Sequence, residues 1–348
     1  MEQIERRQAV ARELGDYDVL IFGGGLSGWA TAVKLARSSH SVLLAASHTS
    51  LGHEVAAAMS VWWPGELELP DLWAEIVDEL SGVNAAHETM VDPVATQVAL
   101  ERRAEEAGVE LLLQVNAHPE AADRTLLTGR WGLMAARSAV TVDAGNRGDI
   151  AVEAGAQIHA RITDEPVIRR ALMVKTGITE PERIEIGEDL PLVDGAVMAW
   201  KGYWPGDVIL EANLDLLPPD ADDPAAICRE VAELEMRSRQ AMAEIVTRLR
   251  RTREEFAQGS LVSVAHDPVL PRSRVLVASQ GDTPSATLRD DGIEVTVTRG
   301  MMLPKGTENV IVASPAVDSG GMTARASYYP PNAVALGEAA ALLAEEML

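Results

Sequence analysis

Three glycines between an apolar strand and a helix constrain the fold of this 348-residue chain more than any other sequence feature. Residues 19–22 form a short apolar run without helical periodicity, which is typical of a strand buried on both faces. Gly23, Gly25 and Gly28 follow with the spacing G-x-G-x-x-G. The next segment, 30–37, consists of good helix formers. This order predicts a tight turn that places the start of the helix at the end of the strand.

The glycine spacing indicates the binding of a diphosphate. In such a unit one glycine makes the tight turn, another lets the backbone approach the diphosphate, and the third lets the helix pack against the strand. The helix N-terminus directs the positive end of its dipole at the anion. Because residues 41–45 return as a second apolar strand, we predict a dinucleotide site. The alternative is a glycine-rich turn without a ligand.

Composition excludes several classes of protein. The chain has 30 basic and 53 acidic residues, and its formal net charge of −23 disfavours nucleic acid and anionic membranes as partners. No apolar window is long enough for a membrane helix, and we do not expect the charged segment 1–7 to be a signal peptide. Cys228 is the only cysteine, so an internal disulfide and a cysteine metal cluster are excluded. We expect a cytoplasmic protein that acts on a small-molecule substrate and has no metal site. The oligomeric state stays open, and a homo-oligomer is one possibility.

Helix signals are clearest in the first half of the chain. Asp92 can act as an N-cap, Pro93 suits the first helical position, and Gly108 lies just beyond a helix that ends at Glu106. Further apolar strands are expected at 109–115 and 138–142, whereas residues 1–15 are expected to be a polar leader.

The alternation of strands and helices stops near residue 160 and resumes near residue 306. Between these points lies a long helix, 224–257, whose apolar positions fall mostly on one face. A buried strand at 309–313 and a helix at 332–347 end the chain. We therefore predict a nucleotide-binding domain made of residues 1–160 and 306–348, split by an inserted substrate domain, 161–305.

Several segments besides the glycines carry a resemblance to a known family. They are residues 91–93 leading to 106–112, the turn 142–151, residues 273–275, the strand 309–313, and residues 323–325 and 335–340. Together they resemble the FAD-dependent oxidoreductases of the glutathione-reductase-like, two-dinucleotide-motif group. The resemblance implies an α/β fold, in which a Rossmann-like FAD-binding domain with a parallel sheet is split by an inserted α+β domain. It also implies FAD as cofactor.

The resemblance assigns the cofactor contacts. Val115 would meet the adenine, Asp143 and Gly145 would line the ADP half, and Asp318 would lie near the ribityl chain or the diphosphate. The start of the last helix would face the pyrimidine end of the flavin, where reduced flavin carries negative charge. The full set implied is Gly23, Gly25, Leu26, Ser27, Gly28, Ser47, Gly52, His53, Val115, Asp143, Gly145, Asp318, Asn332 and Ala333.

One cofactor contact departs from the family pattern. The second strand should end in Asp or Glu, which binds the adenosine ribose, but Ala46 stands there. Ser47, His48 or Thr49 could substitute, although a hydroxyl contact is weaker than a carboxylate contact. The departure supports an alternative function, a catalytically degenerate flavin-fold protein that acts as a binding or assembly partner.

Four residues are candidates for catalysis. His53 could act as an acid or base near neutral pH, anchor the flavin covalently, or only cap the loop. Arg274 and Arg325 could bind a substrate anion through bidentate contacts or form structural salt bridges. Tyr328 could wall the site or fill core. Because only one dinucleotide motif occurs, an oxidase or dehydrogenase is favoured over a pyridine-nucleotide reductase, and a monooxygenase stays open.

Overall fold

A parallel sheet extends to both sides of the strand that precedes the glycines. In the computed structural model, β1 (Arg12–Phe22) pairs with β2 (Val42–Ala46) on one side and with β8 (Gly132–Asp143) on the other. β5 (Glu110–Leu113) extends the sheet beyond β2, and β18 (Val310–Val312) pairs with β8. All four pairings are parallel. A strand from the C-terminal end of the chain thus joins an N-terminal sheet, and the predicted Rossmann-like core is confirmed.

The structure describes most of the chain, and the remaining elements of the first body complete this core. The described residues are 10–160, 165–218, 223–272, 274–290, 292–320 and 322–348. Besides the strands above, the elements are α1 (Leu26–Arg37), α2 (His53–Ala56), α3 (Asp71–Gly82), β3 (Ala86–His87), β4 (Met90–Val91), α4 (Pro93–Ala107), β6 (Val115–Ala121), β7 (Arg124–Gly129), α5 (Asp149–Glu153), α7 (Arg299–Met302), α8 (Ala324–Ser327) and α9 (Pro330–Met347).

Local signals explain several of these boundaries. The side chain of Asp92 accepts the N–H of Ala95 at 2.8 Å and caps α4, and Gly108 ends that helix with a φ of +82°. In contrast, β1 begins at Arg12, within the stretch predicted to be a polar leader. Residues 12–17 pair with β8, which provides their backbone hydrogen bonds despite a polar sequence.

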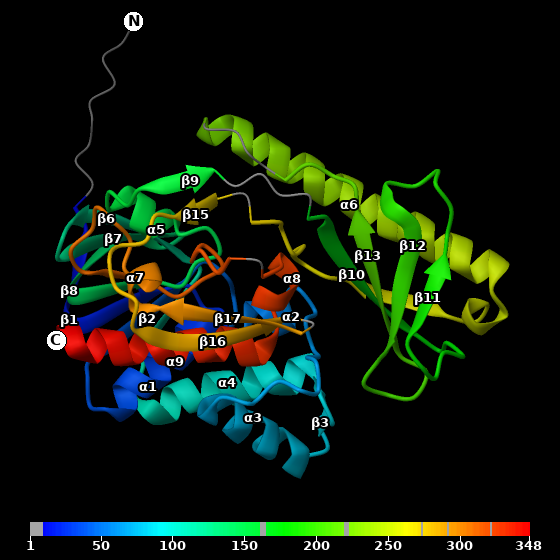
Figure 1. The fold of residues 1–348 in the computed structure, drawn as a ribbon, viewed down its shortest axis with the longest axis horizontal. Helices are drawn as coiled ribbons and strands as arrows, with labels where there is room; N and C mark the ends of the chain where they lie inside the picture. The colour runs from blue at the N-terminus through cyan, green and yellow to red at the C-terminus, as the bar shows by residue number, and fades with distance from the viewer. Residues whose placement is uncertain (1–9, 161–164, 219–222, 273, 291, 321) are drawn as a thin grey trace, which may run out of the picture.

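Two helices from opposite ends of the chain pack side by side against this sheet. Figure 1 shows α9 (red) lying beside α1 (blue) under the sheet. Their contact is close because Gly337 has no side chain; a Cβ there would lie 2.2 Å from the carbonyl oxygen of Ser27. The hydroxyl of Thr31 donates to the carbonyl of Gly337 at 3.0 Å. The N-terminus of α9 is thereby held near the N-terminus of α1.

The second body is an antiparallel sheet covered by one long helix, at the right of Figure 1. Its strands follow the order β11-β12-β13-β10-β14, and α6 packs a row of apolar side chains onto them. The bounds are β10 (Val167–Val174), β11 (Glu182–Glu185), β12 (Leu192–Lys201), β13 (Val208–Leu214), α6 (Pro224–Thr252), η1 (Glu254–Phe256) and β14 (Ser260–Val264). Among the described residues no helix is both long and apolar enough to cross a membrane.

The segment 274–303 packs with the first body, although the sequence assigned it to the insert. β15 (Arg274–Leu276) pairs with β9 (Ile158–Ala160), and the hairpin of β16 (Pro284–Asp290) and β17 (Ile293–Thr298) lies against α9. Leu276, Leu288 and Val297 are buried in the core that contains β1 and α1. We therefore propose that the inserted domain ends near residue 272 and not at 305.

Candidate active site

The glycine corner, residues 23–28, joins β1 to α1 as predicted. Gly23 has a φ of +121°, a conformation that residues with a side chain rarely adopt. A Cβ atom on Gly23 would lie 2.4 Å from the carbonyl oxygen of Ala144, and one on Gly28 would lie 1.9 Å from the carbonyl oxygen of Gly23. Glycine is required at both positions because a side chain there would collide with the backbone of a neighbouring segment. α1 begins at Leu26, so its first N–H groups have no partner within the helix.

The carboxylate of Glu54 occupies the N-terminus of α1. Glu54 lies on α2 and is only 7% exposed, and its Oε2 accepts the N–H of Leu26 at 2.8 Å. A Cβ on Gly25 would lie 2.7 Å from its other oxygen. A diphosphate oxygen is accepted at such a position in dinucleotide-binding proteins. The backbone therefore fits the diphosphate of FAD, and in this conformation the carboxylate stands in for one of its oxygens.

The N-terminus of α9 faces the same place. Ser27 and Glu54 line a cavity of about 20 Å³ together with Asn332 and Ala333. The Asn332 side chain has a structural function: its Nδ2 donates to two backbone carbonyls at 2.8 Å and its Oδ1 accepts the N–H of Arg289 at 3.1 Å. Because this cavity holds little more than one water molecule, FAD fits here only when Glu54 turns away.

The predicted adenosine side lies at the other end of the corner. Val115 is buried at the start of β6, and the N–H of Gln114 donates to the carbonyl of His48 at 3.1 Å. That bond ties the loop after β2 to the edge of the sheet. Ala46 is fully buried at the end of β2, so it offers the ribose no polar group, while Ser47 is exposed beside it.

Two predicted acidic contacts have local partners. Asp143 is fully buried, and its two oxygens accept the N–H groups of Gly145 and Ala151, both at 2.9 Å. Burial raises the pKa of Asp143 to about 7, although the backbone hydrogen bonds act in the opposite direction. Asp143 thus holds the turn that precedes α5. Asp318 is exposed and accepts the N–H of Gly320 at 3.3 Å.

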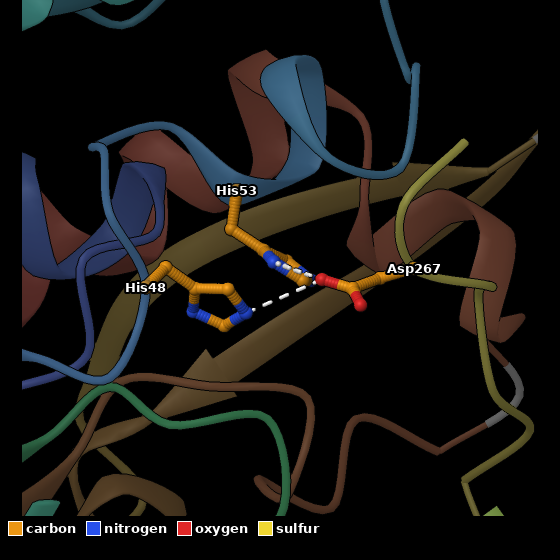
Figure 2. A group of neighbouring side chains, drawn as sticks. All are labelled: His48, His53 and Asp267. Carbon is orange, nitrogen blue, oxygen red and sulfur yellow. Dashed lines mark hydrogen bonds and ion pairs between the residues drawn. The ribbon is translucent and has the colours of Figure 1, made fainter. Parts of the chain in front are cut away.

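A cluster of His48, His53 and Asp267 lies beside the corner, and we call it the histidine cluster. His48 follows β2 and His53 begins α2 after Gly52, whose φ is +71°. Asp267 comes from the inserted domain, and its N–H donates to the carbonyl of Ala57 at 3.2 Å. Figure 2 shows the three side chains pointing toward one another. Nε2 of His48 and Nδ1 of His53 each lie 3.2 Å from the same oxygen, Oδ2 of Asp267.

The histidine cluster lines a cavity of about 260 Å³. The hydrogen bond from His48 and the neighbouring His53 hold the pKa of Asp267 far below its usual range, and the bond to Asp267 raises the pKa of His48. Tyr328 lies in the wall of the cavity, its ring 6.0 Å from the ring of His53. Burial, followed by the charges of Glu54 and Asp267, raises the pKa of Tyr328.

A second cluster, at the domain boundary, contains Arg325. The guanidinium of Arg325 donates to Glu211, a carboxylate that is 3% exposed. Nε of Arg170 donates to the other oxygen of Glu211 at 2.7 Å. The guanidinium of Arg170 also lies over the ring of Trp62, 5.1 Å from its centroid, and that of Arg325 lies over the ring of Trp200, 5.4 Å from its centroid. We call these five residues the junction cluster; it contacts both bodies and already provides an anionic partner for Arg325.

The structure thus places most sequence-predicted residues around one corner, and adds three that the sequence analysis did not select. Glu54, Asp267 and Glu211 are these additions. Glu54 could have been suspected because it follows Gly52–His53 in a loop predicted to run along the cofactor. Asp267 and Glu211 carry no local motif. Arg274 begins β15, and its side chain lies outside the part of the chain that the structure describes.

Comparisons with known proteins agree with this architecture. Residues 18–166 match the sequence model of the family described as FAD dependent oxidoreductase. No curated protein matches the chain. The open form of NikD, an unusual amino acid oxidase essential for nikkomycin biosynthesis, is 15% identical with a TM-score of 0.56, over 95% of this chain and 94% of that chain.

Two other solved structures show the same fold. A geranylgeranyl bacteriochlorophyll reductase-like protein from Thermoplasma acidophilum is 12% identical with a TM-score of 0.53, over 95% of this chain and 78% of that chain. The flavin-dependent brominase Bmp2 is 12% identical with a TM-score of 0.55, over 95% and 79%. At these identities the likeness concerns the fold, whereas the family match concerns the sequence around the glycine corner. Residues 18–166, fewer than half of the chain, are thus similar in sequence to the FAD dependent oxidoreductase family.

Proposed function

We propose that this chain is an FAD-dependent oxidase or dehydrogenase that moves a hydride or electrons between a small organic substrate and the flavin. The observation that carries the proposal is the glycine corner, where the N-terminus of α1 and the N-terminus of α9 face one site. FAD, when bound, supplies the redox chemistry, and the protein supplies binding, orientation and electrostatics. The presence of a single glycine motif favours reduction by the substrate itself over reduction by a nicotinamide.

The backbone at the two helix ends would hold the cofactor. The N–H of Leu26 and the glycines beside it would bind the diphosphate, because helix N-termini favour anions. Ala333 lies in the first turn of α9, whose dipole stabilises negative charge on a reduced flavin ring. Glu54 has to leave the N-terminus of α1 first, because two anions cannot share one donor group without strong repulsion.

The cavity beside the histidine cluster would hold the substrate. Its volume of about 260 Å³ suits a small organic molecule and is just below the usual range for ligand pockets. The ordinary pKa of tyrosine, about 10, keeps Tyr328 protonated at neutral pH, and burial raises this pKa further, so its hydroxyl can donate a hydrogen bond to a substrate oxygen. His53 faces the same cavity and would hold or move a proton there. The exposed single Cys228 suits a reducing compartment, and we propose the cytoplasm.

Flavin titration tests this proposal. Freshly purified protein is expected to show a flavin absorbance spectrum, or to quench flavin fluorescence saturably when FAD is added. Acid precipitation distinguishes the attachment: colour that stays with the pellet indicates a covalent flavin, and His53→Ala would then release it. Protein that is folded by circular dichroism but gains no flavin signal from excess FAD would contradict the proposed redox function.

A second candidate function is a degenerate flavin fold that acts as a binding or assembly partner. The observation that favours it is Glu54, whose carboxylate already satisfies the N–H of Leu26. If this candidate is correct, neither the wild type nor a Glu54→Gln variant binds FAD. Binding by the variant alone would indicate a site that Glu54 closes.

A further inference from the structure

We propose that His48, His53 and Asp267 are three ligands of a divalent transition-metal ion such as Zn²⁺. The three side chains come from the loop after β2, from α2 and from the inserted domain, and converge on one point (Figure 2). Two imidazoles and one carboxylate form a ligand set that binds zinc and related ions in many proteins. This site needs no flavin, so metal binding can be tested separately from the redox function proposed above.

The distances within the cluster agree with coordination of one ion. Three donor atoms at about 2.1 Å from a tetrahedral ion are about 3.4 Å from one another. Nε2 of His48 and Nδ1 of His53 both lie 3.2 Å from Oδ2 of Asp267, and all three donor atoms are within 4.8 Å of one another. Small side-chain rotations are therefore sufficient to place the three atoms around an ion.

Both histidines also have the outer partners that metal-bound imidazoles use. Nδ1 of His48 lies 3.4 Å from the hydroxyl of Ser47, which can accept its proton. Nε2 of His53 lies 3.3 Å from the side-chain amide of Asn146, and this amide accepts an N–H when its oxygen faces the ring. With these protons placed outward, the two inner nitrogens present lone pairs to the ion.

Nδ1 of His53, one of the two nitrogens that would bind the ion, is buried and lacks a hydrogen bond. His53 is 6% exposed, and its Nδ1 has no hydrogen-bond partner of acceptable geometry, although Asp267 is near. A buried polar nitrogen without a partner is unfavourable, and a metal ion would satisfy it. The one carboxylate and the two neutral imidazoles together carry a charge of −1. A bound divalent cation would therefore change the net charge of the site to +1.

The ion would have an open coordination position. All three ligands line the cavity of about 260 Å³, so a fourth ligand, water or a substrate oxygen, can enter from that side. The ion would also join the inserted domain to the first body, since Asp267 belongs to the former. With the ion bound, His53 would no longer have the proton-transfer role proposed above, because Nδ1 of His53 would be a metal ligand.

Metal titration of the full-length protein tests the site without flavin. Protein treated with a chelator and then dialysed is titrated with Zn²⁺ by calorimetry, and with Co²⁺ while visible absorption is recorded. We expect one equivalent to bind, and a Co²⁺ spectrum of tetrahedral or five-coordinate type. His48→Ala and Asp267→Asn should each weaken Zn²⁺ binding at least tenfold, and circular dichroism shows whether each variant is folded.

His118→Ala is the matched control. His118 forms an exposed pair with Glu153 at 3.3 Å, so this variant removes a histidine next to a carboxylate without changing the cluster. Its affinity for Zn²⁺ should equal that of the wild type. The proposal fails if the wild type binds no ion, or if His48→Ala and Asp267→Asn, both folded, bind Zn²⁺ as tightly as His118→Ala. In either case the cluster is only a hydrogen-bonded ion pair.

Discussion

The glycine corner and the clusters at the domain boundary are built in different ways. The corner uses backbone atoms of residues that are close in sequence, and its geometry follows from the absence of side chains at Gly23 and Gly28. The clusters use side chains that are far apart in sequence; His48 and Asp267, for example, are separated by 219 positions. The geometry of the corner is therefore encoded locally, whereas the side chains of the two clusters are brought together by domain packing.

Removing Glu211 should have the largest effect on the domain boundary. Glu211→Ala leaves the buried guanidinium of Arg170 and that of Arg325 without their carboxylate, and breaking a buried ion pair costs about 3–5 kcal/mol. Urea unfolding measures this loss. The control, Glu233→Ala, removes an exposed pair with Arg237 and should change the free energy of unfolding by less than about 0.5 kcal/mol. A similarly small change for Glu211→Ala would contradict a packed domain boundary.

Adding a methyl group at Gly28 should disrupt the corner. The new Cβ would lie 1.9 Å from the carbonyl oxygen of Gly23, and overpacking of this kind costs about 1–3 kcal/mol. We expect Gly28→Ala to lower the midpoint of urea unfolding and to abolish FAD binding in a fluorescence titration. Gly82→Ala, at the end of α3 with no atom within 4 Å of the new Cβ, should leave both unchanged. Normal FAD binding by Gly28→Ala would show that the corner is not the cofactor site.

Neutralising Glu54 should make FAD bind more tightly. Glu54→Gln removes the negative charge that competes with the diphosphate for the N–H of Leu26. A hydrogen bond to a charged group contributes about 1.5–3 kcal/mol, and the amide of the variant recovers part of it, so we expect roughly tenfold higher affinity by fluorescence titration. Glu66→Gln makes the same change of charge on an exposed residue and should have no effect. Weaker binding by Glu54→Gln would mean that Glu54 assists the cofactor.

The smallest expected effect concerns the pH dependence of the first strand pair. The N–H and the hydroxyl of Ser41 donate to Asp18 at 2.7 and 2.9 Å, and they lower the pKa of this carboxylate. A lowered pKa contributes stability above the unfolded pKa, and the contribution is lost as pH falls through the folded pKa. Asp18→Asn should therefore be less stable by at most about 0.5 kcal/mol at pH 7, because the group is exposed.

This pH effect is checked by thermal unfolding at several pH values. The difference between Asp18→Asn and the wild type should be complete above about pH 5 and should vanish in strong acid, where the carboxyl group is protonated in both states. Asp16→Asn, two residues away and exposed, is the control for the change of charge. A difference that grows with acidity would reverse the sign and reject the hydrogen-bond explanation.

Much of the fold could be predicted because its signals are local. Asp92, Pro93 and Gly108 define α4 through capping and backbone conformation, which depend on a few neighbouring residues. The start of β1 was predicted incorrectly because the polar residues from Arg12 onward are held in a strand by pairing with β8, which overrides their own preferences. The proposed transfer of 274–303 from the insert to the first body rests on packing against α9, which no local pattern indicates.

The candidate site was only partly accessible to the same reasoning. His53 was selected because it follows Gly52 in the loop beside the cofactor position, but its partner Asp267 could not be found from a single sequence. Arg325 was expected to bind a substrate anion or to form a structural salt bridge, but its pairing with Glu211 depends on β13, more than a hundred residues earlier. Pairs of this kind require the path of the whole chain.

The sequence by itself determined the strand, the glycine turn and the helix N-terminus, because steric exclusion at Gly23 and Gly28 and helix dipoles act over a few residues. Only the tertiary structure decided which side chains surround that helix end. Glu54 reaches the N–H of Leu26, and Asp267 meets two histidines, because α2 and the inserted domain pack against the corner. Such contacts result from the summed packing of distant segments, which no short stretch of sequence specifies.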